Sequence, residues 1–73
     1  MPLVQISVPA GSLSQEKKAA MIAKVTDACL EAEGIPAARQ FTWVQINEVP
    51  DGGWGMGGRA VTLEQMQAAL APK

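Results

Sequence analysis

The sequence predicts an α+β fold built on one β-α-β unit, in which a crossover helix joins two parallel strands. Three observations support this prediction: apolar residues alternate along residues 4–8, a helical pattern runs from about residue 14 to residue 33, and a second β-branched run occupies residues 41–49. Two strands separated by such a helix favour parallel pairing with a right-handed crossover. A short hairpin and a short second helix are expected after this unit.

The first strand is predicted over residues 3–8, where alternate residues fall on opposite faces. Pro9-Ala10-Gly11 then forms a turn that ends it. Ser12 and Ser14 are both candidate N-caps of the following helix. Ser12 begins a capping-box spacing, whereas a cap at Ser14 places Glu16 in the first turn, where a carboxylate is favourable.

The long helix is predicted to end at about Glu33, because Gly34 and Pro36 supply a stop signal. Its apolar stripe consists of Ile22, Val25, Cys29 and Ala32, widened by Met21 and Ala28. Cys29 is therefore interpreted as a small buried hydrophobic residue rather than as a nucleophile.

The second strand is predicted over residues 41–49, which are rich in β-branched and aromatic side chains. Residues 50–53 form a turn, and the glycine-dense residues 54–58 are expected to host a short hairpin. Thr62-Leu63-Glu64-Gln65 has the spacing of a capping box and begins a short amphipathic helix that ends at about Ala71.

Length and composition limit the classes of function that fit. The chain has 73 residues, one cysteine and no histidine, so an internal disulfide is excluded and a zinc site is not expected. Its net charge is −1 and it has no basic tract, which argues against a nucleic-acid partner. No membrane span or signal peptide is indicated, so we expect a cytoplasmic protein.

An oligomer is expected from the same pattern. One helix covers only one face of a two-stranded sheet, and the other face carries Leu3, Trp43 and polar residues. Both edges of such a sheet are unpaired. A chain this short, with 48% hydrophobic residues, is expected to complete its core against copies of itself.

Pro2 is the candidate catalytic residue. Histidine, the usual group that exchanges protons near neutral pH, is absent, and an α-amine has the ordinary pKa closest to 7, at about 7.7–8.0. Removal of Met1 makes this amine the secondary amine of Pro2, which is then able to act as a general base or to form an iminium with a carbonyl. The structural alternative is a proline that only opens a strand.

Four segments carry a resemblance to a known family. They are Met1-Pro2 opening onto a strand, Ser14-Gln15-Glu16-Lys17-Lys18 at a helix start, Asn47-Glu48-Val49, and Gly53-Trp54-Gly55-Met56-Gly57-Gly58. The chain resembles the tautomerase superfamily, in particular the small 4-oxalocrotonate tautomerase-like proteins. The resemblance covers about residues 2–61, so residues 1–73 are expected to form one domain with residues 62–73 as a C-terminal extension.

The resemblance implies an assembly and a reaction. In this family β-α-β units pair into dimers, and the dimers form a hexamer as a trimer of dimers. A processed N-terminal proline is the general base in keto–enol tautomerisation of 2-hydroxydienoates and similar pyruvoyl compounds, without a metal or organic cofactor. The matched positions here are Pro2 for the base and Trp54 for an aromatic residue, commonly Phe, that lines the pocket.

The family's carboxylate-binding arginines have no counterpart at the matched positions. Ser12-Leu13 stands at one of them and Trp43 at the other. Arg39 and Arg59 are the only arginines in the chain, and each is a candidate for the missing cation, including from across a subunit boundary. Weak activity on the dicarboxylate 2-hydroxymuconate is therefore expected.

The expected function is a cofactor-free tautomerase of a small 2-oxo or 2-hydroxydienoic acid. Pro2 is the expected base, Arg59 or Arg39 binds the substrate carboxylate, and Trp54 walls the pocket. Two alternatives stay open: a hydratase, dehalogenase or decarboxylase that uses the same proline, and a non-catalytic oligomeric subunit. The expected partners are a small carboxylate substrate and copies of this chain, with no nucleic acid and no membrane.

Overall fold

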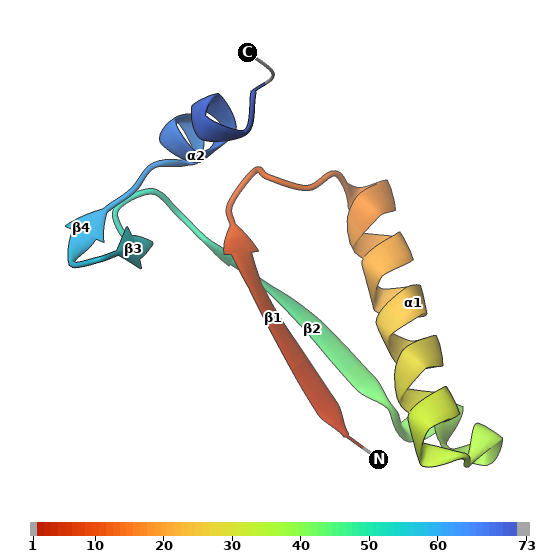
Figure 1. Ribbon diagram of the computed structural model, residues 1–73. Helices are drawn as coiled ribbons and strands as arrows, with labels where there is room; N and C mark the ends of the chain where they lie inside the picture. The colour runs from red at the N-terminus through yellow and green to blue at the C-terminus, as the bar shows by residue number, and fades with distance from the viewer. Residues whose placement is uncertain (1, 72–73) are drawn as a thin grey trace.

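The computed structural model describes residues 2–71 and confirms the β-α-β unit (Figure 1). Strands β1 (Leu3–Pro9) and β2 (Trp43–Val49) pair in parallel, and α1 (Gln15–Glu33) connects them along one face of the sheet. The elements in chain order are β1 (Leu3–Pro9), α1 (Gln15–Glu33), the 3-10 helix η1 (Pro36–Phe41), β2 (Trp43–Val49), β3 (Gly55–Met56), β4 (Arg59–Ala60) and α2 (Leu63–Leu70).

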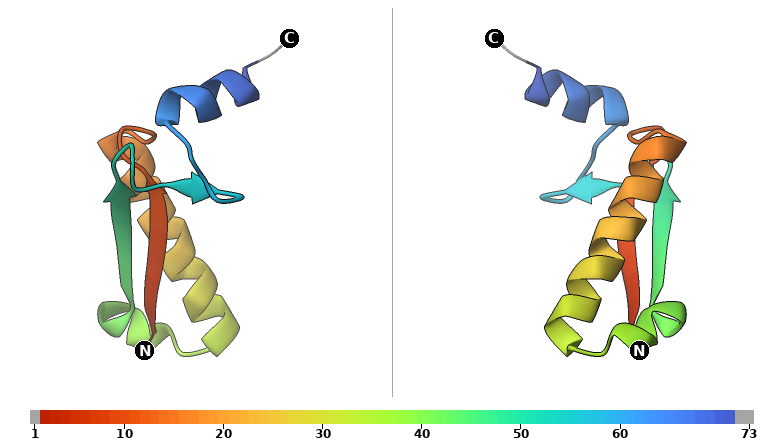
Figure 2. Two further views of the ribbon diagram at one scale, coloured as in Figure 1. Left: turned by 90° about the vertical axis from the view of Figure 1, so that its left-hand side faces the viewer. Right: turned by 90° about the vertical axis from the view of Figure 1, so that its right-hand side faces the viewer.

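The parallel register places Leu3 opposite Trp43 and continues to Pro9 opposite Val49. Because side chains alternate along a strand, one face carries the half-buried apolar residues and the other carries exposed ones. Figure 2 shows α1 against the first face and no helix of the described chain against the second. The uncovered face consists of Leu3, Gln5, Ser7, Trp43, Gln45 and Asn47.

The ends of α1 are fixed by the residues that the sequence indicated. Ser14 is the N-cap, since its hydroxyl accepts a hydrogen bond from the backbone N–H of Lys17 at 3.2 Å. The hydroxyl of Ser12 instead donates to the carbonyl of Pro9 at 2.7 Å within the preceding turn. Gly34 ends the helix in the left-handed conformation with φ of 72°, where a residue without a side chain is favoured.

The predicted apolar stripe of α1 is wrong in part. Thr26 is the buried residue of the helix, and Ile22, Ala28 and Ala32 are exposed. The threonine hydroxyl donates to the carbonyl of Ile22 at 2.7 Å, so its polar atom is satisfied on the inner face. A pattern based on hydrophobicity alone therefore misplaced the stripe, although Met21, Val25 and Cys29 are half-buried as expected for it.

The predicted start of the second strand is also wrong. Phe41 belongs to η1, and β2 begins at Trp43. Pro36 suits the first turn of a helix, and two i→i+3 bonds then tighten the segment: Ala38 N–H to Ile35 carbonyl at 3.0 Å and Thr42 N–H to Arg39 carbonyl at 3.2 Å. Residues 41–43 are aromatic or β-branched, so their sequence favoured a strand and did not indicate this turn.

The glycine-dense segment forms the expected hairpin. Strands β3 and β4 pair antiparallel around Gly57 and Gly58, whose φ values of 61° and 83° suit a tight two-residue turn. Thr62 then caps α2 in a full capping box with Gln65. Hairpin and α2 extend beyond the end of the sheet at which β2 finishes (Figure 1).

One protomer encloses almost no core. Within residues 2–71 the buried residues are Ala38, 7% exposed, and Thr26, 8% exposed. The radius of gyration is 15.3 Å, whereas a compact domain of this length has a value of roughly 11 Å. No helix of the described chain is long and apolar enough to cross a membrane.

Candidate active site

Pro2 is held at the end of the sheet where both strands begin. Its carbonyl accepts a hydrogen bond from the backbone N–H of Trp43 at 3.0 Å. This bond continues the parallel pairing by one residue beyond β1, because Leu3 is the register partner of Trp43. The main chain of Pro2 is therefore anchored to β2 independently of any side chain.

A depression of about 380 Å³ adjoins Pro2. Its lining consists of Pro2, Leu3, Phe41 and Trp43, so residues from the start of β1 meet aromatic residues from η1 and β2. Trp43 is 63% exposed and Phe41 is 50% exposed. The side chains of Leu3, Phe41 and Trp43 carry no charge, and such surroundings favour the neutral form of an amine.

Phe41 was not expected to be a site residue, and no site role was expected for Trp43. The parallel register of β1 and β2 is the signal that could have identified both residues. Once β2 starts near Trp43 and β1 starts next to Pro2, the beginnings of both strands lie side by side at one end of the sheet. Any aromatic residue at the start of the second strand is then a neighbour of the N-terminal proline.

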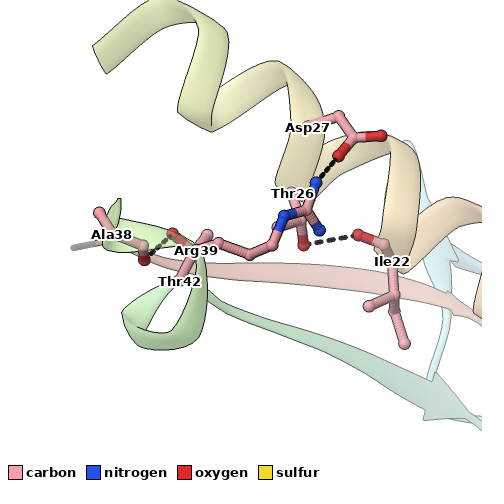
Figure 3. Close-up of polar contacts among 6 residues, drawn as sticks. All are labelled: Ile22, Thr26, Asp27, Ala38, Arg39 and Thr42. Atoms are coloured by element: carbon pink, nitrogen blue, oxygen red, sulfur yellow. Dashed lines mark hydrogen bonds and ion pairs between the residues drawn. The ribbon is translucent and has the colours of Figure 1, made fainter. Parts of the chain in front are cut away.

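Arg39 lies at the same end of the sheet but faces α1. Its guanidinium donates to the carboxylate of Asp27 in an ion pair that Figure 3 shows reaching from η1 to the helix. Both side chains are exposed to solvent. Arg39 is accordingly not among the residues that line the depression beside Pro2.

Trp54 and Arg59 lie at the opposite end of the sheet from Pro2. Trp54 follows β2 and Arg59 begins β4, whereas Pro2 precedes β1. Because β1 and β2 run in parallel, the length of a seven-residue strand separates the two places, which is about 23 Å. Within one protomer the structure therefore does not bring these two residues together with Pro2.

Glu48 has a structural partner near the end of β2. Its carboxylate binds Lys18 of α1 at 2.9 Å. The hydrogen bond and charge of Lys18, together with the backbone N–H of Gly11, hold the pKa of Glu48 below its usual range. Glu48 therefore ties α1 to β2 as a carboxylate.

No metal site is apparent in the part of the chain that the structure describes. Within residues 2–71, no group of three or more His, Cys, Asp or Glu residues could hold a metal ion. Asp51 is engaged with its own chain, since its side chain accepts a hydrogen bond from the backbone N–H of Leu63 at 2.8 Å. Met1, whose removal the expected chemistry requires, lies outside the described residues.

Comparison with known proteins matches this chain to one family. The family model described as "Tautomerase enzyme" matches residues 2–64. The chain is 45% identical to a 2-hydroxymuconate tautomerase of Comamonas testosteroni over 58 residues, which cover 80% of this chain and 87% of the relative. It is 43% identical to a 2-hydroxymuconate tautomerase of Pseudomonas putida with the same coverage of both chains.

The fold is also similar to that of a solved structure. A crystal structure of an apo unFused 4-OT superposes with a TM-score of 0.73 at 30% identity, over 82% of this chain and 93% of that chain. The family assignment favours an enzyme over a non-catalytic subunit. The chain belongs to the tautomerase family, and it is an isomerase.

Proposed function

We propose that this protein catalyses the keto–enol tautomerisation of a small 2-oxo or 2-hydroxydienoic acid with the Pro2 nitrogen as general base. The observation that carries the proposal is the position of Pro2, anchored through Trp43 at the edge of an open apolar depression. The 2-hydroxymuconate tautomerases that the chain resembles support the same type of reaction.

The reaction needs only one group that carries a proton. After Met1 is removed, the neutral Pro2 amine takes the proton from the 2-hydroxyl of the enol. The resulting ammonium returns that proton to carbon 3 or carbon 5 of the conjugated chain, and the hydroxyl oxygen becomes the 2-keto oxygen. Atoms and charge balance without a redox partner, and general acid–base catalysis of this kind contributes typically 10²–10⁴-fold.

A cation should hold the substrate carboxylate and stabilise the developing enolate. Arg59 is our first candidate, because it is exposed on β4 and pairs with no carboxylate within residues 2–71. It has to come from a second protomer, since its own Pro2 lies at the other end of the sheet. Trp54 would arrive with the same hairpin and close the pocket. Arg39 would have to leave Asp27 to take this role.

Because Arg59 has to come from a second protomer, the complete site exists only in an assembly. We propose that this assembly is a hexamer built as a trimer of dimers. One protomer exposes 5557 Å² of surface, whereas a compact protein of this mass exposes roughly 4,300 Å². The uncovered sheet face and the projecting hairpin expose apolar side chains that their own chain does not cover. Contacts between subunits typically bury surface of this kind.

The proposal is tested by following enol absorbance with protein whose intact mass shows a free Pro2. We expect ketonisation of the monocarboxylate 2-hydroxy-2,4-pentadienoate and weaker activity on the dicarboxylate 2-hydroxymuconate, because the lining of the depression offers no second cation. Pro2→Ala keeps an amine but loses the ring that fixes its direction, so its rate should fall. No rate above buffer with either substrate would refute the proposal.

A further inference from the structure

The two aromatic side chains beside Pro2 indicate which substrates the site accepts. We propose that Phe41 and Trp43 form a binding surface for a flat apolar substituent, so that the enzyme prefers monocarboxylic 2-oxo acid enols with an aryl group on carbon 3. This inference rests on the proposed function and adds the substrate class and the two residues that determine it.

The position of Trp43 relative to the catalytic nitrogen is fixed by the main chain. Its backbone N–H bonds to Pro2, and its register partner Leu3 lines the same depression. The indole is 63% exposed within one protomer, so no part of its own chain covers the aromatic surface. Because the tie to Pro2 uses only backbone atoms, replacing the indole removes the aromatic surface without removing the tie.

Charge in the depression favours an apolar group over a second carboxylate. Apart from the Pro2 amine itself, none of the described lining residues is charged, and the guanidinium of nearby Arg39 is paired with Asp27. A second carboxylate placed against the lining would lose hydration without gaining a partner. An aryl ring in the same place gains stacking against Trp43 or an edge contact with Phe41.

The apolar surface continues beyond Phe41, which gives room for a substituent larger than a vinyl group. Phe41 also lines a second depression of about 270 Å³. The other residues around that depression are Glu33, Ile35, Ala37 and Ala38. Phe41 thus lies between the two hollows, and a ring that stacks on Trp43 can extend along it.

The experiment compares two monocarboxylate enols that differ in the aryl group, phenylenolpyruvate and 2-hydroxy-2,4-pentadienoate, in protein with free Pro2. Trp43→Leu and Phe41→Leu should each lower kcat/KM for phenylenolpyruvate by about tenfold or more, mainly through KM, the scale on which apolar pocket contacts discriminate. The pentadienoate rate should change less than about threefold. Trp43→Phe should restore most of the loss, and Leu70→Ala, which truncates a residue 84% exposed on α2, should change neither.

Every other result would contradict either this inference or the proposed function. Equal losses on both enols, or dissociation of the Trp43→Leu assembly in light scattering, would make Trp43 a structural or subunit-contact residue and overturn the inference. Unchanged phenylenolpyruvate kinetics in both leucine variants would do the same. If the unsubstituted protein converts neither enol, the proposed function itself fails, which is a result distinct from a lost preference.

Discussion

The backbone N–H of Trp43 donates to the carbonyl of Pro2 at 3.0 Å, so the first residue of β2 anchors the proposed base. A general base must lie within hydrogen-bond reach of the proton that it removes, and its direction matters as much as its basicity. The hydrogen bond to Trp43 holds the main chain of Pro2, so the fold itself sets the direction of the basic nitrogen.

The pH dependence of the rate should report the Pro2 amine. Apolar neighbours such as Leu3 and Trp43 disfavour a charged ammonium, so the pKa of the processed amine is expected below that of an ordinary α-amine. The neutral amine is the base, and kcat/KM should therefore rise with pH through that pKa and then level. A rate that is flat from pH 5 to pH 9 would remove Pro2 from this role.

Assembly should be tight enough that no folded monomer accumulates. The described chain buries only Ala38 and Thr26, and a protomer with so little core is not expected to be stable alone. Light scattering at micromolar concentration should give an assembly, and a hexamer is our specific expectation. A stable species of 7.7 kDa that retains the helical circular dichroism signal would contradict this prediction.

Arg59→Ala should lower kcat/KM by about one to two orders of magnitude, since a charge-assisted hydrogen bond is worth about 1.5–3 kcal/mol. Lys24→Ala is the matched control, because Lys24 is exposed on α1 and no role is proposed for it. If Arg59→Ala is unchanged, the cation is Arg39 or is absent. Asp27→Asn, which frees Arg39, distinguishes these two cases by raising the rate only in the first.

The Lys18–Glu48 ion pair should make stability depend on pH in the acidic range. The folded protein holds the pKa of Glu48 below its usual range, so the pair stabilises the fold above the ordinary carboxyl pKa, which is about 4.3. That stabilisation is lost as the pH falls through the lowered value.

The measurement is the urea midpoint of Glu48→Gln and unsubstituted protein at equal concentration. At pH 7 the urea midpoint of Glu48→Gln should be lower than that of the unsubstituted protein. The difference between the two midpoints should become smaller as the pH falls. Glu31→Gln, at an exposed position of α1, is the control and should leave the midpoint nearly unchanged. A gap that stays constant down to pH 2 would show that the pair contributes nothing to the pH dependence.

Local patterns were sufficient to predict the order of the strands and of the two α-helices. Alternation over β1, a serine cap and the stop at Gly34 act within a few residues. The structure confirms the alternation and the stop, and it selects Ser14 from the two candidate caps. The turn around Phe41 was missed because 3-10 bonding and strand propensity compete in an aromatic segment. The inward position of Thr26 was missed because its satisfied hydroxyl does not appear in a hydrophobicity pattern.

The arrangement of the candidate site could be predicted only in part. Pro2 was identified from the absence of histidine and from the resemblance, and the structure adds Phe41 and Trp43 through the parallel register. Arg59 and Trp54 lie a strand length away in the same protomer. Whether they meet another Pro2 depends on contacts between chains, which no spacing within one chain specifies.

The role of the Pro2 nitrogen is tested by comparing Met1-retained with Met1-cleaved protein, prepared at matched concentration and assigned by intact mass. A retained methionine turns the Pro2 nitrogen into an amide, which has no basic lone pair, but the Trp43 N–H contact to the Pro2 carbonyl needs no free amine. We predict turnover of 2-hydroxy-2,4-pentadienoate by the cleaved form alone, with the same circular dichroism spectrum and assembly in both forms. Equal turnover by the two forms would contradict the Pro2 mechanism.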